Sequence, residues 1–237
     1  MLVISGSVLF NNSYSFGQKI RWLGLLAKTR RNQRMMRLAT AIMAKSDAAE
    51  PVIIDIGANV GLFTTAFMAA VKPPKLVLAI EPSNYVFAIL KIVTAKLDRV
   101  LCHKLALSHV GGEVQLKTPV KESGSLRVGL SHIGDGNELT AFVENVQAKR
   151  LDDLLIAESI THVDIVKIDV EGMEYDILKT LPFAIQDRKL KDLDLEKEYP
   201  TLKDLMKEQG VSTDLADYWD KECELSPSNP HCLEYDD

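Results

Sequence analysis

Two carboxylates and a pair of glycines stand where this sequence could bind a small ligand. Asp55 lies near the end of one apolar run, Gly57 and Gly61 follow it, and Glu81 ends the next apolar run. Glycines just after a strand form a tight turn where backbone can approach a ligand closely. An acid about 20 residues beyond such a turn reaches ribose hydroxyls in nucleoside-binding folds. The candidate ligand contacts are Asp55, Gly57, Ala58, Asn59, Gly61, Glu81 and Pro82.

The turn lacks the features of the common phosphate-binding motifs. Asn59 stands where G-x-G-x-x-G needs its middle glycine, and Leu62 and Phe63 follow Gly61 where a phosphate loop has Lys and Ser or Thr. S-adenosylmethionine has no phosphate and needs carboxylates for its ammonium and ribose, with backbone for its own carboxylate. Asp55 and Glu81 supply those acids, so we expect this cofactor. The alternative without a ligand is a structural glycine turn, with Glu81 favouring the helix that starts at Ser83.

Four segments in order, VIIDIGANVGLFT from Val52, AIEPS from Ala79, LALS from Leu105 and KIDVEGMEYDIL from Lys167, resemble the FkbM-type methyltransferases. The likeness covers about residues 50 to 210. It implies a class I methyltransferase fold, S-adenosylmethionine as the methyl donor and, most often, an oxygen acceptor. It also implies that the turn and Glu81 contact the cofactor, and that Ala106 and Leu107 border the adenine.

The sequence departs from this family on the acceptor side. The segment after the KIDVEG helix is short, and Glu196-Lys197-Glu198 stands where similar proteins have a His shortly after the glutamate. The main alternative is therefore a non-catalytic binding or interaction module that keeps the methyltransferase fold. A nucleotide- or NAD-dependent enzyme is the third reading.

Methyl transfer to a hydroxyl requires a group that removes its proton. Asp169 and Glu171 follow a buried strand and are our candidates, with helix-dipole compensation as the alternative role for this acidic cluster. His132 lies in a Gly- and Ser-rich stretch and is the next candidate, although a lone loop histidine is more often polar surface. No cluster of His and Cys has ligand spacing, so no metal is expected.

The elements that must position these residues alternate between strand and helix from Pro51 onward. Buried strands are predicted at 52–56, 75–80, 100–107 and 163–169, with helices at 61–71, 83–97 and 150–159. This pattern predicts an α/β fold, a doubly wound and mostly parallel Rossmann-like sheet with its ligand beyond the carboxyl ends of the strands. The segment 117–137 is expected to be a loop that covers the acceptor, and 193–196 a last strand.

Three regions are expected along the chain. Residues 1–50 form an N-terminal helical extension, 51–210 the methyltransferase domain and 211–237 a C-terminal tail. The basic cluster from Lys28 to Arg37 is interpreted as a solvated face, with contact to a membrane surface or to nucleic acid as the alternative.

Charge and composition indicate the partners and the compartment. The formal net charge of −5 argues against a nucleic-acid-binding surface. We therefore expect the methyl acceptor to be the hydroxyl of a small molecule, a sugar or a lipid. No apolar run reaches the ~20 residues that span a bilayer, so no integral membrane segment is expected.

An odd number of cysteines without C-x-x-C favours a soluble protein of the cytoplasm. The Arg-rich, acid-free N-terminus leaves a mitochondrial transit peptide as the alternative. The oligomeric state is not indicated.

Overall fold

The computed structural model divides the chain into two compact units, Met1–Arg188 and Lys189–Asp237. It describes Val8, residues 11–28, 33–121, 123–133 and 141–170, and positions 173, 174, 177 and 180, all of which lie in the first unit. The expected strand at 193–196 and the expected C-terminal tail at 211–237 lie outside the described residues.

Four parallel strands form the central sheet, here called sheet A. They are β1 (Val52–Ile56), β2 (Leu76–Ile80), β3 (Val100–His103) and β8 (Ile165–Ile168), in the order β3-β2-β1-β8. The strands are short apolar runs because both faces of the sheet are covered. In the register, Asp55 of β1 lies between Ala79 of β2 and Lys167 of β8, which places a lysine beside an acid within the sheet.

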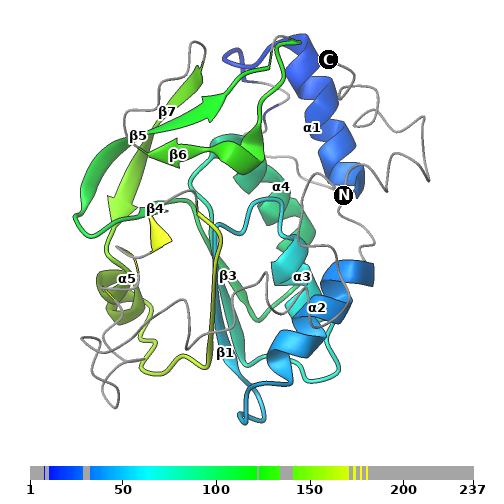
Figure 1. Cartoon of the computed structure of the whole chain (residues 1–237), viewed down its shortest axis with the longest axis vertical. Coiled ribbons are helices and arrows are strands. Elements are labelled where there is room, and N and C mark those ends of the chain that lie inside the picture. Colours follow the sequence, from blue (N-terminus) through cyan, green and yellow to red (C-terminus); the bar gives the residue numbers. More distant parts are fainter. Residues whose placement is uncertain are drawn as a thin grey trace. The chain divides into compact units, whose positions relative to one another are not determined.

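Helices cover both faces of sheet A (Figure 1). On one face, α5 (Leu151–Ala157) packs on Ile54 and Ile56 of β1 and on their neighbours in β2. On the other face, α3 (Leu62–Met68) packs on Ile53 and Val77, while α4 (Asn84–Thr94) places Leu90 against Ala79. Alternate residues of each strand therefore serve opposite cores. The predicted doubly wound, mostly parallel α/β fold is confirmed.

A second sheet, sheet B, lies above the carboxyl ends of the parallel strands in Figure 1. It contains β4 (Ala106–Leu107), β7 (Ala141–Lys149), β5 (Gly112–Pro119) and β6 (His132–Ile133), in that order. The expected strand 100–107 is thus divided between the two sheets, with β3 in sheet A and β4 in sheet B. The expected loop 117–137 begins as part of β5 and includes the 3-10 helix η2 (Val128–Leu130) and β6, while 134–140 lies outside the described residues.

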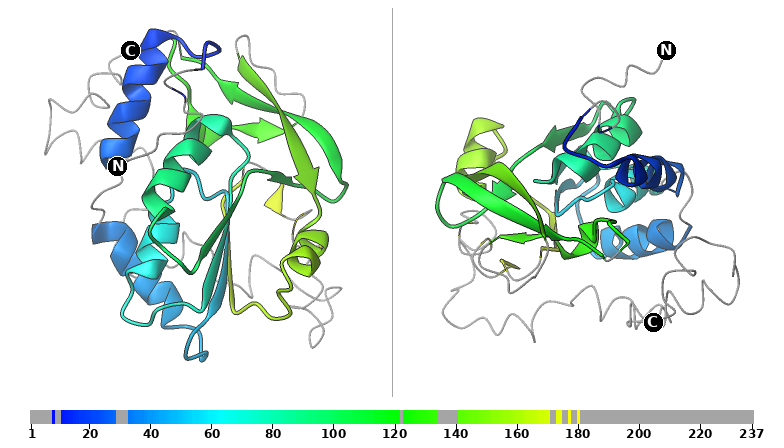
Figure 2. Two further views of the ribbon diagram at one scale, coloured as in Figure 1. Left: turned by 180° about the vertical axis from the view of Figure 1, so that it is seen from behind. Right: turned by 90° about the horizontal axis from the view of Figure 1, so that it is seen from above.

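Two N-terminal helices, α1 (Phe16–Lys28) and α2 (Gln33–Met43), pack on the same unit, as Figure 2 shows from two further sides. Trp22 of α1 is fully buried in a cluster with Val60, Tyr85 and Ile89. Met43 of α2 is buried against α3 and β1. Part of the hydrophobic core therefore comes from residues that precede the α/β pattern. No helix within the described part of the chain is long and apolar enough to cross a membrane.

Candidate active site

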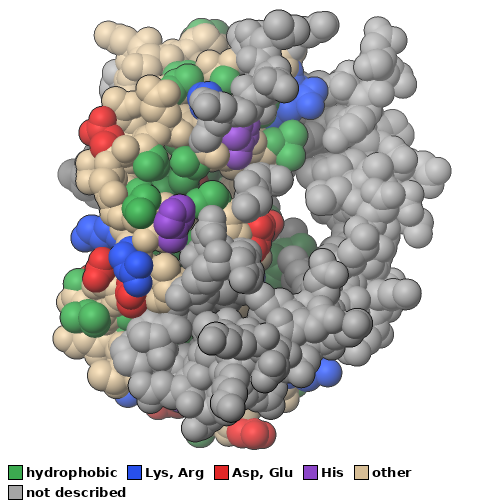
Figure 3. All heavy atoms as spheres, turned by 60° about the vertical axis from the view of Figure 1, so that its left-hand side comes forward, with side chains coloured by type: hydrophobic (Ala, Val, Ile, Leu, Met, Phe, Trp, Pro, Cys, Tyr) green, Lys and Arg blue, Asp and Glu red, His purple; other side chains and the backbone are tan. Residues whose placement is uncertain are grey.

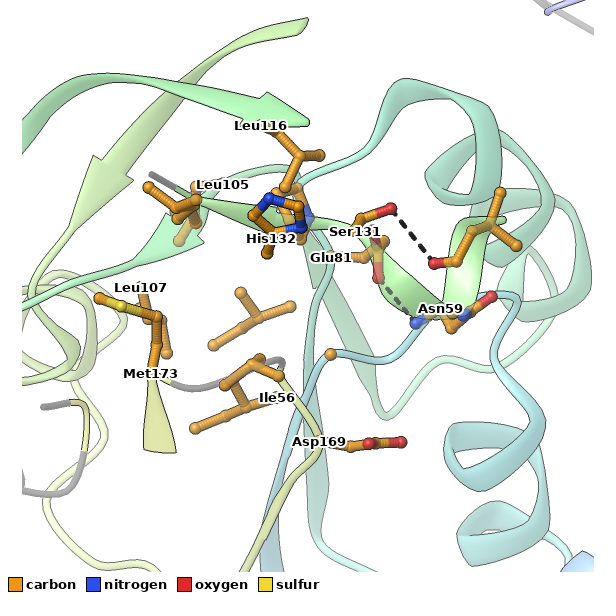
Figure 4. Close-up of a pocket in the computed structure, with 18 residues that line it drawn as sticks. Ile56, Asn59, Glu81, Leu105, Leu107, Leu116, Ser131, His132, Asp169 and Met173 are labelled. Carbon is orange, nitrogen blue, oxygen red and sulfur yellow. Dashed lines mark hydrogen bonds between the residues drawn. The ribbon is translucent and has the colours of Figure 1, made fainter. Parts of the chain in front are cut away.

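A pocket opens at the carboxyl ends of the sheet A strands, where open α/β sheets bind ligands (Figure 4). The end of β1 and the glycine turn supply Ile56, Gly57 and Asn59, and the end of β2 supplies Glu81 and Pro82. Further lining residues come from sheet B and the segments beside it: Leu105, Ala106, Leu107, Leu116, Val128, Gly129, Ser131, His132 and Ile133. Asp169, Val170 and Met173, which follow β8, close the remaining side.

The glycine turn brings two backbone segments into contact. Gly57 has a φ of +71°, and a Cβ at this position would lie 2.0 Å from the carbonyl oxygen of Asp169. No side chain fits between these two backbones, so glycine is required by both conformation and space. The turn and the start of the segment after β8 are therefore held together at the pocket wall.

The N–H groups of the turn are all used within the protein. Gly57 and Ala58 donate to the carbonyl oxygen of Ile80, at 3.0 and 2.9 Å, and Gly61 donates to the carbonyl oxygen of Ala58. The remaining two donate to side chains, Asn59 N–H to Glu81 and Val60 N–H to the Asn59 Oδ1. A phosphate site needs backbone N–H groups that point at the anion. This turn has none to offer between residues 57 and 61.

Glu81 is the buried acid of the pocket, with 6% of its surface exposed. Its two carboxylate oxygens accept backbone hydrogen bonds from Asn59 and Ser83, both at 2.9 Å. The first of these bonds is drawn in Figure 4. Burial raises the pKa of Glu81 to about 7, against the lowering effect of these two bonds and of Lys167. Each oxygen keeps a second lone pair for a hydroxyl donor.

A second buried acid, Glu144 of β7, binds the residues that follow Glu81. Its carboxylate accepts from the Ser83 hydroxyl at 2.9 Å and from the Asn84 backbone N–H at 3.1 Å. Ser83 in turn accepts from the Tyr85 N–H and so caps α4. Sheet B is thus joined to the helix that follows Glu81. Nothing in the local sequence around Glu144 predicted this role, because it depends on the pairing of β5 with β7.

Asp55, expected to contact the cofactor, does not line the pocket. Its side chain is fully buried, accepts from the Thr64 hydroxyl at 2.6 Å and lies 3.2 Å from the ammonium of Lys167. Lys167 also donates to the carbonyl oxygen of Gly57 at 2.9 Å. In this geometry, Asp55 holds the Lys167 ammonium next to the glycine turn. A lysine inside the otherwise apolar run of β8, opposite an acid in β1, was the sequence signal for this pair.

Ala58 and Gly61, also expected at the cofactor, do not line the pocket either. Ala58 is buried against Ala79 and Leu90. Gly61 has a φ of +84°, and a Cβ there would lie 2.9 Å from the Leu90 side chain and 3.0 Å from that of Val93. Both residues therefore serve the close packing of the turn and α3 on α4.

The side of the pocket opposite the glycine turn is apolar. Leu105, Leu107 and Met173 lie together there in Figure 4, with Leu116 above them. Ala106 and Leu107, expected at the adenine, belong to this wall and are buried. The pocket thus has an apolar slot facing a polar wall that contains Glu81 and Asn59.

The candidate bases lie at different places. Asp169 follows β8, and its exposed carboxylate is 3.5 Å from the Lys167 ammonium. His132 lies across the pocket from it in Figure 4. Its Nδ1 lies 3.3 Å from the Leu130 carbonyl oxygen, and its Nε2 is buried. A ring that donates from Nδ1 to this oxygen would have its lone pair on Nε2. Glu171 lies outside the described residues.

The described charged residues that line the pocket are acidic. The two acids Glu81 and Asp169 line the pocket, and no lysine or arginine does among the described residues. On the face shown in Figure 3, hydrophobic side chains gather near the histidines, and acidic and basic side chains lie next to one another at the lower left. Within the described ranges, no group of three or more His, Cys, Asp or Glu could hold a metal ion.

Comparison with known proteins gives a family. The model of the FkbM methyltransferase domain matches residues 55–208. Among characterised sequences, the 2-O-methyltransferase NoeI of Sinorhizobium fredii is 25% identical over 152 residues, which are 60% of this chain and 62% of NoeI. Methyltransferase 1 of Beauveria bassiana is 24% identical over 179 residues, which are 68% of this chain and 72% of that protein. The chain spans less than two thirds of NoeI.

Two solved structures resemble parts of the chain. The FkbM methyltransferase of Methylobacillus flagellatus is 13% identical, with a TM-score of 0.37, 88% of this chain and 53% of that chain covered. The TYW2 protein of M. jannaschii, solved with AdoMet, is 24% identical, with a TM-score of 0.23 and coverage of 38% and 33%.

Proposed function

The chain belongs to the FkbM methyltransferase family, as its sequence predicted, and from this premise we propose that it transfers a methyl group from S-adenosylmethionine to a hydroxyl oxygen. The observation that supports the donor best is the pairing of every N–H group from Gly57 to Gly61 within the protein. Such a turn can pack against a ligand but has no backbone N–H group between residues 57 and 61 to offer a pyrophosphate, which favours a nucleoside cofactor without phosphate. The carboxylate of that cofactor would then bind outside these five N–H groups.

The charges of the pocket fit the same donor. Glu81 and Asp169 give it an acidic lining, which suits a cofactor with a sulfonium and an ammonium group. Glu81 would accept hydrogen bonds from the ribose hydroxyls, and the wall that contains Leu105 and Leu107 would border the adenine. When bound, S-adenosylmethionine supplies a methyl group made electrophilic by the sulfonium charge.

A residue beside the methyl donor would remove the proton from the acceptor hydroxyl. Asp169 is our first candidate because its carboxylate is exposed at the pocket edge and is held by the Lys167 ammonium. His132 is the second, since it lines the pocket and an imidazole nitrogen can accept a proton. For Glu171, two residues beyond Asp169, we propose a supporting role in orienting the acceptor or the helix. The segment from Val128 to Ile133, which contains η2 and β6, would cover the acceptor.

The oxygen acceptor is supported by the name of NoeI, a 2-O-methyltransferase. The acceptor would be the hydroxyl of a small molecule, a sugar or a lipid. We propose that this methyl transfer does not require a metal ion.

Calorimetric titration of the full chain with S-adenosylmethionine, S-adenosylhomocysteine, NAD and ATP tests the donor. Only the first two should bind. Transfer of labelled methyl to a panel of hydroxylated sugars, lipids and natural products then tests the reaction. Binding of NAD or ATP alone would overturn the proposal, and donor binding without transfer to any acceptor would favour a non-catalytic module.

A further inference from the structure

The outward face of α1 is apolar from Phe16 to Ala27, over the positions whose side chains the structure describes. Phe16 is 80% exposed, Ile20 53% and Leu23 42%. The other exposed positions of the helix are Gly17, Gly24 and Ala27. At 3.6 residues per turn these positions share one side of the helix. We call this set of six residues the α1 stripe.

The α1 stripe is separate from the face that packs on the core. Gln18 and Trp22 are buried on the opposite side, where the Trp22 indole donates to the Tyr85 carbonyl oxygen at 2.8 Å. A surface helix of a globular protein normally has one apolar face and one polar face. This helix instead has a core face anchored by hydrogen bonds and an outer face without a polar side chain.

Basic side chains border the α1 stripe. Lys19 and Arg21 lie on α1 itself, at its partly exposed flanks. Next to the helix, the Gln18 amide donates to the Gly124 carbonyl oxygen at 3.1 Å and Arg21 contacts the Ser123 hydroxyl at 3.5 Å. In sequence, that adjoining segment contains the basic residues Lys121 and Arg127 and the acidic residue Glu122. Residues 1–46 contain no Asp or Glu.

We propose that the α1 stripe docks the protein on the surface of an anionic lipid bilayer. An apolar stripe with basic flanks is the arrangement that binds the plane of such a surface, where apolar side chains enter the headgroup boundary and cations face acidic lipids. The helix has 13 residues, too few for the ~20 that cross a bilayer, so it lies on the surface. A nucleic acid would satisfy the cations but not Phe16, Ile20 and Leu23.

The core face of α1 connects this surface to the pocket. Trp22 belongs to the same hydrophobic cluster as Leu126 and Val128, and Val128 lines the pocket. The helix that presents the α1 stripe is thus connected through a few packed side chains to the wall that we assign to the acceptor.

Flotation of the full chain with vesicles tests the proposal. Vesicles of phosphatidylcholine with phosphatidylserine should bind the protein, and vesicles of phosphatidylcholine alone should bind it much less. Raising the salt concentration should weaken binding, because ions screen the basic flanks. Lys19→Gln should lower partitioning by about fivefold, the effect of one cation near an anionic surface.

The variant Phe16→Ser/Ile20→Ser/Leu23→Ser should reduce vesicle binding by about tenfold or more, since it removes the apolar contact. A matched control, Val71→Ser/Val110→Ser/Ile156→Ser, changes three other exposed apolar residues, which are 94%, 55% and 68% exposed, and should bind vesicles normally. Calorimetric binding of S-adenosylmethionine reports that both variants are folded.

Equal binding of the two triple variants, or no preference for anionic vesicles, would overturn the proposal. A dimer in light scattering that the α1 stripe variant abolishes, without vesicle binding by the parent chain, would assign the stripe to a second copy and overturn it as well.

Discussion

The ammonium of Lys167 donates a 2.9 Å hydrogen bond to the carbonyl oxygen of Gly57, so a cation from β8 holds the glycine turn that follows β1. The same ammonium lies 3.2 Å from a carboxylate oxygen of Asp55 and 3.5 Å from one of Asp169. Asp55 and Lys167 are partners in the strand register, so the sheet itself sets this contact. One buried lysine therefore links a core acid, the proposed donor site and a proposed base.

Replacing Lys167 by Met should destabilise the protein by about 3–5 kcal/mol, because it leaves the Asp55 carboxylate buried without its cation. Urea unfolding measures the change. The double variant Asp55→Asn/Lys167→Met removes both charges and should recover part of the loss. If the double variant is as unstable as Lys167→Met alone, the ion pair is not the cause.

Glu81→Gln should weaken binding of S-adenosylmethionine by about 1–3 kcal/mol, because the amide cannot replace a charged acceptor for the ribose hydroxyls. It should also lower stability, since the carboxylate accepts backbone bonds from Asn59 and Ser83 and Gln offers only one oxygen. Glu144→Gln is the matched control, because that acid is buried beside α4 but does not line the pocket. Equal losses of affinity in both variants would assign Glu81 to the fold alone.

The raised pKa of Glu81, about 7, predicts two opposite pH effects. Donor affinity should fall as pH drops below about 7, because protonation removes the charged acceptor. The free energy of unfolding should change in the opposite direction. The pKa of Glu81 is raised from 4.5, so the folded state binds the proton more tightly than the unfolded state does. The stabilisation that results is fully present below about pH 4.5 and is lost as the pH rises towards 7. Titrations at several pH values test both, and Glu81→Gln should remove both trends.

Gly57→Ala should abolish donor binding and destabilise the fold, because its Cβ would lie 2.0 Å from the Asp169 carbonyl oxygen. Gly124→Ala separates steric overlap from backbone strain. Gly124 has a similar φ of +79° but nothing within 4 Å of a Cβ, so its variant should cost only about 1 kcal/mol. Similar effects of the two substitutions would show that the contact with Asp169 is unimportant.

The parts of the fold that depend on local patterns could be predicted from the sequence. The apolar runs of β1 and β2, the glycines and Glu81 are close in sequence, and their spacing alone indicated a parallel sheet with a ligand at its carboxyl edge. Contacts set by strand register could not be predicted. The buried role of Asp55 requires β8 to lie beside β1, and the role of Glu144 requires the full β5 and β7 pairing. Sheet B depends on pairing between segments joined by a long connection.

The N-terminal helices give a prediction that differs from the sequence expectation. The sequence predicts residues 1–50 as an extension separate from the methyltransferase domain, so a chain lacking residues 1–46 would fold and bind cofactor. Since Trp22 and Met43 are buried in the core, we now expect that truncation to yield unstable protein. Trp22→Ala should cost about 3–5 kcal/mol in thermal or urea unfolding. The control Leu23→Ser, at a residue 42% exposed on the same helix, should change stability by less than about 1 kcal/mol.

Asp169→Asn and His132→Gln should separate the two proposed bases. Asp169 pairs with Lys167 at the edge of the pocket, while His132 lies across it on β6. If Asp169 removes the acceptor proton, Asp169→Asn should lower kcat by about 10²–10⁴ with little change in donor affinity, because general base catalysis acts in the transition state. His132→Gln should then have a smaller effect, mainly on the KM of the acceptor.

Glu171→Gln extends the same comparison to the position two residues beyond Asp169. A supporting acid should give a loss smaller than that of Asp169→Asn, because it orients the acceptor or the helix without taking the proton. The pH profile of kcat identifies the base independently of these losses, since the ionisation of the responsible group disappears in its own variant and persists in the others. A large loss in His132→Gln together with near-normal turnover in Asp169→Asn would assign the base to the histidine and leave Asp169 as a partner of Lys167 alone.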